Sequence, residues 1–389
     1  MALGLLLCSL AGQAVERVAL VTMGPGEEYW SRFGHNAVMI VEDGGAATFY
    51  NFGYFDFDQP GFLSRFMRGR MLYRLVALGA EQDLDQYRRS GRSVRVQWLD
   101  LRPDQAAALA QDLAWQAQPE NSEYRYDYFY ANCSTKVRDA LDQALGGIIR
   151  KQMGGRSRGL SFRDEALRLG YPERWMYYGM HLGLGIAADQ SMSRWQEAFV
   201  PERLAEATAL IKRDDGSPLV VGDEQWLPQR VESPPATPPR FAISATLAGL
   251  TWALSLLLLA KRPGIAGTLG RLMFALSVLA IGLAGLLMCG LWAFTDHAAA
   301  WANRNLLLFS PLAPLLLAAL PALAKGRPVA AVWRYLALLH LLAGLAAIGA
   351  YLLPIQAQDN LEWILLMLPV LFALHRLLAR PASGERQIV

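Results

Sequence analysis

The sequence predicts an α+β domain followed by an all-α membrane domain of about five transmembrane helices. The chain has 389 residues, of which 53% are hydrophobic, and its mean hydropathy of +0.19 is too high for an ordinary soluble enzyme. Its character changes near residue 240, where charged, aromatic and turn residues give way to long apolar runs. The stretch LPQRVESPPATPPR lies at this change, and its prolines cannot continue a helix or a strand. We therefore expect a linker between two domains.

The chain begins with a candidate targeting segment. The stretch MALGLLLCSLAGQA is apolar and ends in small residues, as a signal peptide does, although it lacks the usual positive start. We predict a signal peptide or an N-terminal anchor. The predicted limits are 1–14 for this segment, 15–226 for the exported domain, 227–240 for the linker, 241–380 for the transmembrane domain and 381–389 for a cytoplasmic tail.

Apolar runs and basic loops alternate in the second half of the chain. A helix needs about 20 apolar residues to cross a bilayer. The runs of this length are 241–260, 270–294, 305–324, 331–352 and 361–379. The loops KRPGIAGTLGR and KGRPVAAVWR and the tail HRLLARPASGER carry the Lys and Arg, whereas TDHAAAWANR and PIQAQDNLE carry one Arg between them. Because basic loops stay in the cytoplasm, we expect a bacterial inner-membrane protein with a periplasmic soluble domain and a cytoplasmic C-terminus.

Charge and motif content exclude several classes of partner. The net charge is only +3, and no long basic run is interleaved with aromatic residues, so nucleic acid is not an expected partner. The sequence has no cluster of His, Cys and carboxylate residues at metal-ligand spacing. We therefore predict no metal and no cofactor, and the sequence does not indicate an oligomeric state.

The exported domain contains one cysteine, Cys133. Cys8 lies in the targeting segment and Cys289 in the second apolar run, so Cys133 has no disulfide partner in the exported domain. In an oxidising compartment a single thiol is either buried or used, which makes Cys133 a candidate nucleophile. The alternative interpretation is a small buried hydrophobic residue.

The position of Cys133 favours the nucleophile. In CSTKVRDALDQAL, Val137 and Leu141 have helical spacing, and Asn132, Ser134 or Thr135 is able to cap the helix. Cys133 is therefore expected at a helix N-terminus, where exposed amides favour the thiolate and could also hold an oxyanion.

A nucleophile of this kind needs a base, and the exported domain has two histidines, His35 and His181. His35 opens HNAVMIVEDGGAATFYNFGYFDF, which predicts a strand, a turn at Asp43-Gly44-Gly45 and a returning strand. Such a hairpin brings Asn51 close to His35, where its amide can orient the imidazole, with Asp56 as second choice. For His181 we expect a structural role.

Several motifs together resemble a known family. The exported domain of the bacterial lipoprotein intramolecular transacylases is similar to the stretches RFGHNAVMI, YNFGYFDF, RFMRGRMLYRL and YDYFYANCSTKVRDAL. In that family the exported domain is followed by several membrane spans. The likeness continues in LGLGIAADQSMSRWQEAFVPERL and TDHAAAWANRNLLLFSPL. The order of the histidine strand and the cysteine helix also resembles the permuted papain-like thiol enzymes. The resemblance implies a permuted papain-like core with Cys133 as nucleophile and His35 as base.

The resemblance also implies a substrate and a chemistry. A membrane lipid or diacylglyceryl lipoprotein would give its acyl chain to Cys133, and an amine would then take the chain from the thioester. Arginines interleaved with aromatic residues could meet anionic headgroups, or could form a solvated face. The residues predicted to bind substrate or headgroup are Arg65, Arg68, Arg70, Tyr128, His297, Asn303 and Asn305.

Two other classes remain open from the sequence. An extracytoplasmic cysteine peptidase, amidase or thioesterase acting at the cell envelope would use the same two residues, although a peptidase has no need of five spans. A non-catalytic membrane assembly factor would use Cys133 only for packing.

Overall fold

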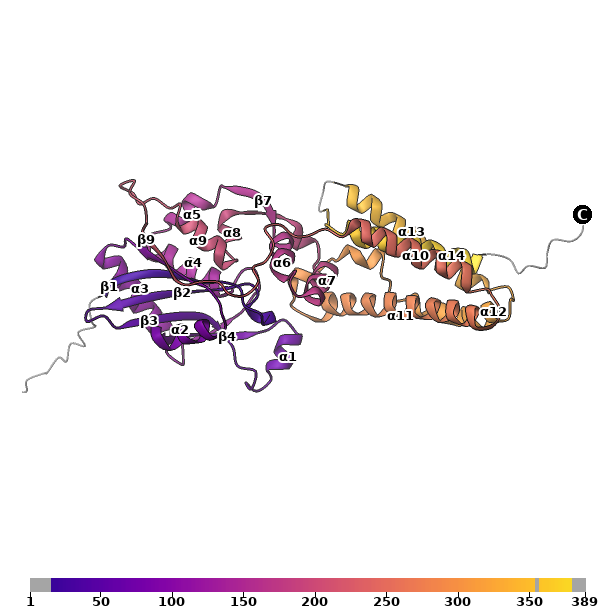
Figure 1. The fold of residues 1–389 in the computed structure, drawn as a ribbon, viewed down its shortest axis with the longest axis horizontal. Helices are drawn as coiled ribbons and strands as arrows, with labels where there is room; N and C mark the ends of the chain where they lie inside the picture. The colour runs from indigo at the N-terminus through magenta and orange to yellow at the C-terminus, as the bar shows by residue number, and fades with distance from the viewer. Residues whose placement is uncertain (1–14, 354–356, 380–389) are drawn as a thin grey trace, which may run out of the picture. The chain divides into compact units, whose positions relative to one another are not determined.

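The computed structural model describes residues 15–353 and 357–379 (Figure 1). The predicted targeting segment at 1–14 and the predicted tail at 381–389 lie outside these residues. The chain divides into two compact units, one formed by the residues up to Leu160 with Ser191–Pro234 and the other by Ser161–Gln190 with the residues from Pro235 onward. The segment Ser161–Gln190 therefore packs with the helical unit, although the sequence analysis placed it in the exported domain.

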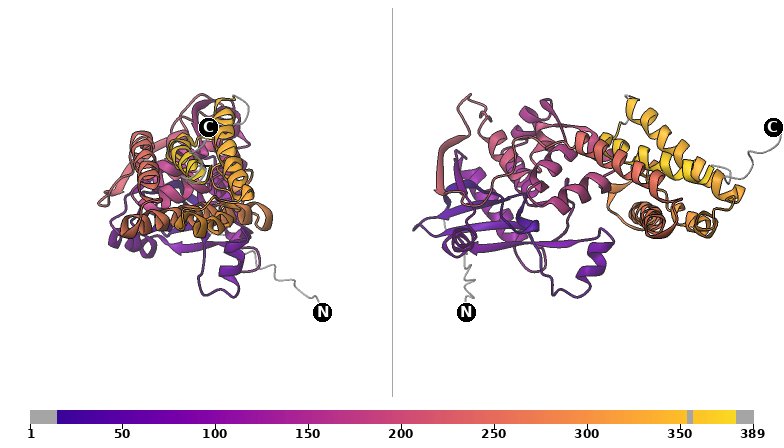
Figure 2. Two further views of the ribbon diagram at one scale, coloured as in Figure 1. Left: turned by 90° about the vertical axis from the view of Figure 1, so that its right-hand side faces the viewer. Right: turned by 45° about the vertical axis from the view of Figure 1, so that its right-hand side comes forward.

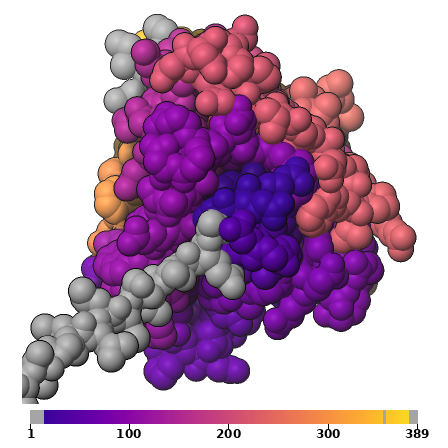
Figure 3. All heavy atoms as spheres, turned by 90° about the vertical axis from the view of Figure 1, so that its left-hand side faces the viewer, coloured from indigo at the N-terminus to yellow at the C-terminus, as the bar shows by residue number. Residues whose placement is uncertain are grey.

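The first unit is built on a seven-stranded antiparallel sheet with the order β6-β4-β3-β2-β1-β5-β9. The strands are β1 (Val15–Met23), β2 (His35–Glu42), β3 (Ala47–Tyr54), β4 (Leu72–Gly79), β5 (Val94–Leu99), β6 (Glu123–Arg125) and β9 (Val220–Leu227). In Figure 3 the late segment that contains β9, coloured salmon, lies beside the early indigo and purple segments, as the pairing of β9 with β5 requires.

Helices cover both faces of this sheet. Side chains alternate along β1, so Val18 and Leu20 face one core and Ala19 and Val21 face the other. The first core is closed by α3 (Pro103–Gln116), α4 (Cys133–Ala144) and α9 (Pro201–Thr208), and the second by α2 (Ala80–Arg89). The remaining elements of this unit are η1 (Tyr29–Ser31), α1 (Phe62–Met67), α5 (Ile148–Met153), β7 (Ser157–Ser161), β8 (Ser191–Ser193) and α8 (Arg194–Glu197).

The predicted hairpin is confirmed. β2 and β3 pair with Ala37 opposite Asn51, and the connecting turn closes with hydrogen bonds between Glu42 and Ala46 and between Gly45 and Glu42. Gly44 and Gly45 have φ of 101° and 86°, a conformation that glycine adopts without a steric penalty. This register places Asn51 opposite Ala37, two residues along β2 from His35 and on the same face of the sheet.

The second unit is helical. Four of its described helices are long and apolar enough to cross a membrane: α10 (Ala242–Leu259), α11 (Gly264–Phe294), α13 (Ala331–Leu352) and α14 (Leu361–Ala379). α14 lies between α10 and α13, as the end-on view in Figure 2 (left) shows. The shorter helices are α6 (Phe162–Gly170), α7 (Arg174–Gly183), η2 (Ile186–Asp189), η3 (Ala298–Ala300), η4 (Arg304–Leu307), η5 (Ala313–Ala319) and α12 (Leu320–Ala324).

The fifth predicted run, 305–324, crosses the helical unit as a broken helix rather than a continuous one. Prolines at 311, 314 and 321 lack the amide hydrogen that a continuous helix needs, and the run breaks into η4, η5 and α12. The run packs along α11, with Phe309 against Gly285 and Pro314 against Gly282.

Polar and basic loops lie at opposite ends of the second unit. At one end Arg240 pairs with Asp359, and Asn303 bonds to Leu182 and Gly183. The opposite end carries the turn between α10 and α11, the turn after α12 and the last turn of α14, as Figure 1 shows within this unit. The two classes of loop in the sequence therefore separate in space.

Candidate functional site

Cys133 is the first residue of α4, as the sequence predicts. The Asn132 side chain accepts a hydrogen bond from the Thr135 amide at 2.9 Å, and the Thr135 hydroxyl accepts one from the Asn132 amide at 2.8 Å. These two bonds form a capping box that fixes where the helix begins. The Asn132 side chain also donates to the Phe199 carbonyl at 2.8 Å, which ties the helix start to the segment before α9.

A chain of hydrogen bonds runs from His35 through Asn51 to Asp83. His35 Nε2 lies 2.9 Å from Asn51 Oδ1, and Asn51 Nδ2 donates to Asp83 Oδ2 at 2.9 Å. Because the carboxylate accepts from the amide nitrogen, the amide oxygen must face the imidazole, so His35 carries its hydrogen on Nε2. The lone pair of His35 is then on Nδ1.

The Cys133 thiol lies near the start of β2, beside the backbone amide of Asn36. Burial raises the pKa of Cys133, while the amides of Asn36 and Ser134 and the charge of Arg92 lower it. The amides act in the expected direction, but desolvation outweighs them, so the pKa of the thiol is raised rather than lowered. Burial also lowers the pKa of His35 to about 4, although the hydrogen bond to Asn51 acts to raise it. The two groups are a neutral thiol and a neutral imidazole at neutral pH.

Two charged residues of this site were not found from the sequence. Asp83 lies on α2, and Arg92 precedes β5; both are buried, with Arg92 only 8% exposed. Arg92 Nε donates to the Gly24 carbonyl at 2.8 Å, and its guanidinium carbon lies 4.8 Å from the centre of the Tyr87 ring. Its Nη2 is buried and has no hydrogen-bond partner in the described part of the chain. The sequence carries no local signal for either residue. Asp83 meets Asn51, and Arg92 comes near Cys133, only when the sheet has formed.

The predicted headgroup arginines lie on and just after α1. Arg65 is half-buried, and Arg68 and Arg70 are exposed. The same helix exposes Leu63 and Met67, at 67% and 64%. Arg74, the next arginine along the chain, forms an ion pair with Glu123 at 2.6 Å.

The other predicted polar residues of this unit lie close to the thiol helix or away from His35. The Tyr128 carbonyl accepts from Asn132 Nδ2 at 3.0 Å, and burial raises the pKa of its phenol. Asp56, the second choice for orienting the imidazole, accepts from the Asp58 amide at 2.9 Å. The side chain that accepts a hydrogen bond from His35 is that of Asn51.

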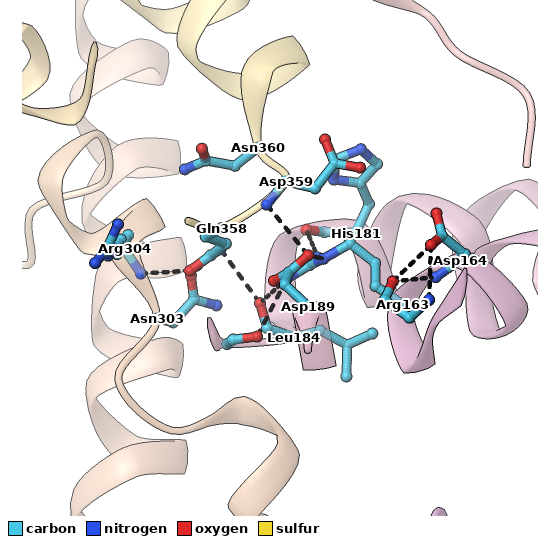
Figure 4. Close-up of polar contacts among 12 residues, drawn as sticks. Arg163, Asp164, His181, Leu184, Asp189, Asn303, Arg304, Gln358, Asp359 and Asn360 are labelled. Carbon is cyan, nitrogen blue, oxygen red and sulfur yellow. Dashed lines mark hydrogen bonds and ion pairs between the residues drawn. The ribbon is translucent and has the colours of Figure 1, made fainter. Parts of the chain in front are cut away.

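Two of the residues predicted from the membrane half are used internally. Asn303 and Asn305 are 3% and 0% exposed, and both donate to the Leu182 carbonyl, at 2.8 and 2.9 Å. Gln358 donates to Asn303 Oδ1 at 2.9 Å (Figure 4). These contacts bind α7 to the rest of the helical unit, and they occupy the side-chain amides of Asn303 and Asn305. His297 is partly buried and precedes η3.

His181 belongs to the same polar cluster. It is fully buried, and its Nδ1 accepts a hydrogen bond from Trp363 at 3.0 Å. Arg163, also fully buried, donates to the His181 carbonyl and forms an ion pair with Asp189 at 2.8 Å (Figure 4). This geometry agrees with a structural histidine.

Comparison with known proteins gives two family matches. Residues 9–155 match the Lnb N-terminal periplasmic domain, and residues 232–380 match the Lnb transmembrane domain. Together the two matches cover most of the chain and include Cys133, His35 and Asn51. No curated protein and no solved structure matches the chain. The permuted papain-like core therefore stays a prediction.

Proposed function

Since the chain belongs to the Lnb family, which matches the lipoprotein intramolecular transacylases that its motifs resemble, we propose that it is a membrane-bound thiol acyltransferase. It moves an acyl chain from a glyceryl ester to an amine, on lipoproteins, through a thioester on Cys133. The family assignment makes it a membrane protein with a periplasmic domain and a role in lipoprotein processing. The acyl transfer itself is what we propose.

The observation that carries the proposal is the order His35–Asn51–Asp83 beside the N-terminus of the cysteine helix. Asp83 orients the Asn51 amide, and the amide fixes the imidazole with Nδ1 as proton acceptor. In this proposal the buried thiol at the start of α4 is the nucleophile, and His35, whose tautomer is fixed, is its base. A cysteine used only for packing has no need of this chain of bonds.

In the first step, the Cys133 thiol gives its proton to His35 Nδ1 as its sulfur attacks the ester carbonyl carbon. The carbonyl π electrons move to oxygen and then return, and the C–O bond to the glyceryl group breaks. The leaving oxygen takes the proton from His35. The products are the acyl thioester on Cys133 and a free glyceryl hydroxyl.

In the second step, an amine attacks the thioester carbonyl. His35 Nδ1 takes a proton from the attacking nitrogen and returns a proton to the departing sulfur. The product is an amide, and the enzyme regains its thiol. If water took the place of the amine, the product would be a free fatty acid, so a thioesterase differs from the transferase only in the acceptor.

The α1 surface supports a lipid substrate. We define it as Leu63, Arg65, Met67, Arg68 and Arg70. Exposed apolar side chains beside arginines are the composition expected where a protein meets anionic headgroups and the upper acyl region of a bilayer. The proposal assigns Arg65, Arg68 and Arg70 to headgroup binding, with Tyr128 nearer the thiol.

The proposed orientation follows the loops of the second unit. Its basic end would face the cytoplasm, which places the C-terminus there and the first unit in the periplasm. In that orientation the thiol acts on the side of the membrane where the acyl chains of lipoproteins are accessible.

The experiment uses the full chain in proteoliposomes with a synthetic diacylglyceryl lipopeptide that has a free terminal amine. Intact-protein mass spectrometry should detect an acyl adduct on wild-type protein that hydroxylamine removes, and lipopeptide mass spectrometry should detect an N-acyl lyso-glyceryl product. Cys133→Ala should give neither. N-acyl product from Cys133→Ala would refute the thioester route, and release of free fatty acid without N-acyl product would indicate a thioesterase.

A further inference from the structure

At the end of β3 a residue without a side chain lies beside the thiol. Gly53 has φ of 91°, and the pairing of β3 with β4 is irregular between Phe52 and Tyr54, as in a β-bulge. A Cβ at residue 53 would lie 3.4 Å from Cys133 Cβ and 3.8 Å from the Cys133 amide nitrogen. Glycine is therefore required by the backbone, and its missing side chain leaves a small volume next to the nucleophile.

A second polar group meets the same volume. The Tyr124 hydroxyl oxygen lies 3.8 Å from the position of that absent Cβ. This oxygen is buried, and its hydroxyl hydrogen has no acceptor in the described part of the chain. A buried hydroxyl that donates to no acceptor is unfavourable, so its presence calls for a ligand or a function.

The Tyr124 ring is held in place from several sides. β6 pairs with β4, with Tyr124 opposite Tyr73. The Phe52 ring meets the Tyr124 ring edge to face at 6.1 Å, and Lys136 Nζ lies 5.3 Å from the centre of the same ring. The hydroxyl therefore has a fixed direction before substrate binds, which is the condition for electrostatic stabilisation without reorganisation.

The Tyr124 phenol keeps its proton. Burial and the neighbouring Cys133 sulfur raise its pKa well above the usual value, although the Gly53 amide acts in the opposite direction. A phenol that stays protonated is a hydrogen-bond donor. The Cys133 amide is a second donor, because the first amides of a helix have no acceptor within it.

We propose that the Tyr124 hydroxyl and the Cys133 backbone amide form an oxyanion site at the space beside Gly53. This inference rests on the proposed acyl transfer and adds the residue that stabilises its transition state. When the Cys133 sulfur bonds to the ester carbon, the carbonyl π electrons move to oxygen, and that oxygen accepts hydrogen bonds from both donors. When the C–O bond to the glyceryl group breaks, the electron pair returns and the donors are released.

The test compares Tyr124→Phe with wild type in the full-length protein in proteoliposomes. One measurement is the rate at which Cys133 is acylated in a single turnover by the diacylglyceryl lipopeptide. The other is the rate at which iodoacetamide alkylates Cys133, a displacement in which no oxyanion forms. Loss of one oxyanion donor is expected to slow acylation by about 10²-fold, while alkylation keeps its wild-type rate. Tyr130→Phe, which removes an exposed hydroxyl of the same stretch, is the matched control and should leave both rates unchanged.

Three results would overturn the inference. Acylation of Tyr124→Phe at the wild-type rate would show that the hydroxyl takes no part. An equal fall in acylation and alkylation would show that the residue only supports the structure. A slowing of similar size in Tyr130→Phe would show that the effect is not specific to Tyr124. Failure of the proposed function is distinguishable, because it would appear as acyl transfer by Cys133→Ala.

Discussion

The amide of Asn51 separates His35 from Asp83, with 2.9 Å on either side. The carboxylate therefore acts on the imidazole only through the orientation of an amide. The amide is neutral, so it fixes the tautomer of His35 without placing a full negative charge beside it. This arrangement suits a base that starts neutral, as the low pKa of His35 implies.

His35→Ala should slow thioester formation by roughly 10²–10⁴-fold, the usual cost of losing a general base. His181→Ala is the matched control, because it removes a histidine that is bonded to Trp363 in the second unit. We expect it to lower the melting temperature and to change the acylation rate much less. Single-turnover acylation and thermal unfolding of both variants are the measurements, and the reverse pattern would exchange the two roles.

Asn51→Ala removes the partner of His35 Nε2 and leaves Asp83 without its amide donor. We expect acylation to slow less than in His35→Ala, because the base is still present but its orientation is no longer fixed. Gln59→Ala is a suitable control, since its side chain contacts Glu123 at the surface. An Asn51→Ala enzyme with the wild-type acylation rate would show that this amide does not position the base.

The pH profile of thioester formation follows from the pKa values. His35 accepts a proton only when it is neutral, and its pKa is lowered to about 4. The rate should therefore stay level from pH 8 down to about 5 and fall as the pH drops through about 4. Alkylation of Cys133 by iodoacetamide should increase with pH to a midpoint above the ordinary thiol value of ~8.5, because burial raises the thiol pKa. A fall in acylation centred near pH 6.5 would contradict the neutral pair.

The local patterns of the sequence predicted part of this site. Two glycines after Asp43 indicated the hairpin that brings Asn51 to His35, and capping residues indicated the start of α4. These features depend on neighbours in the chain. Asp83 and Arg92 could not be found in this way, because they reach the site through strand pairing and helix packing.

Three details of the site and of the helical unit depend on packing that the sequence does not show. The thiol pKa was expected from the helix terminus alone, but burial is a property of the folded unit and it dominates. The run at 305–324 was judged by hydropathy, whereas its prolines decide the helix geometry. The side-chain amides of Asn303 and Asn305 look available in the sequence, but in the fold they bond to the Leu182 carbonyl and to Gln358 and Asn360.

The α1 surface should contact lipid. In nanodiscs that contain spin-labelled lipid, a fluorophore introduced at Leu63 should be quenched, and one at Val221, which is similarly exposed on β9, should not. Leu63→Glu should slow acylation of membrane-bound lipopeptide, because a carboxylate opposes insertion beside anionic headgroups. It should leave iodoacetamide alkylation of Cys133 unchanged. Equal quenching at both positions would argue against a specific lipid surface.

The topology of the second unit can be tested with an impermeant thiol reagent on intact cells. Ala298 lies in η3 at the polar end, and Ala330 precedes α13 at the basic end; both are exposed, so cysteines there can react. Because basic loops stay inside, we expect labelling of Ala298→Cys in intact cells and labelling of Ala330→Cys only after permeabilisation. The two positions lie at opposite ends of one packed helical unit, so each serves as the control for the other. The reverse pattern would place the first unit in the cytoplasm, away from the lipoproteins, and would remove the basis for acyl transfer at the outer leaflet.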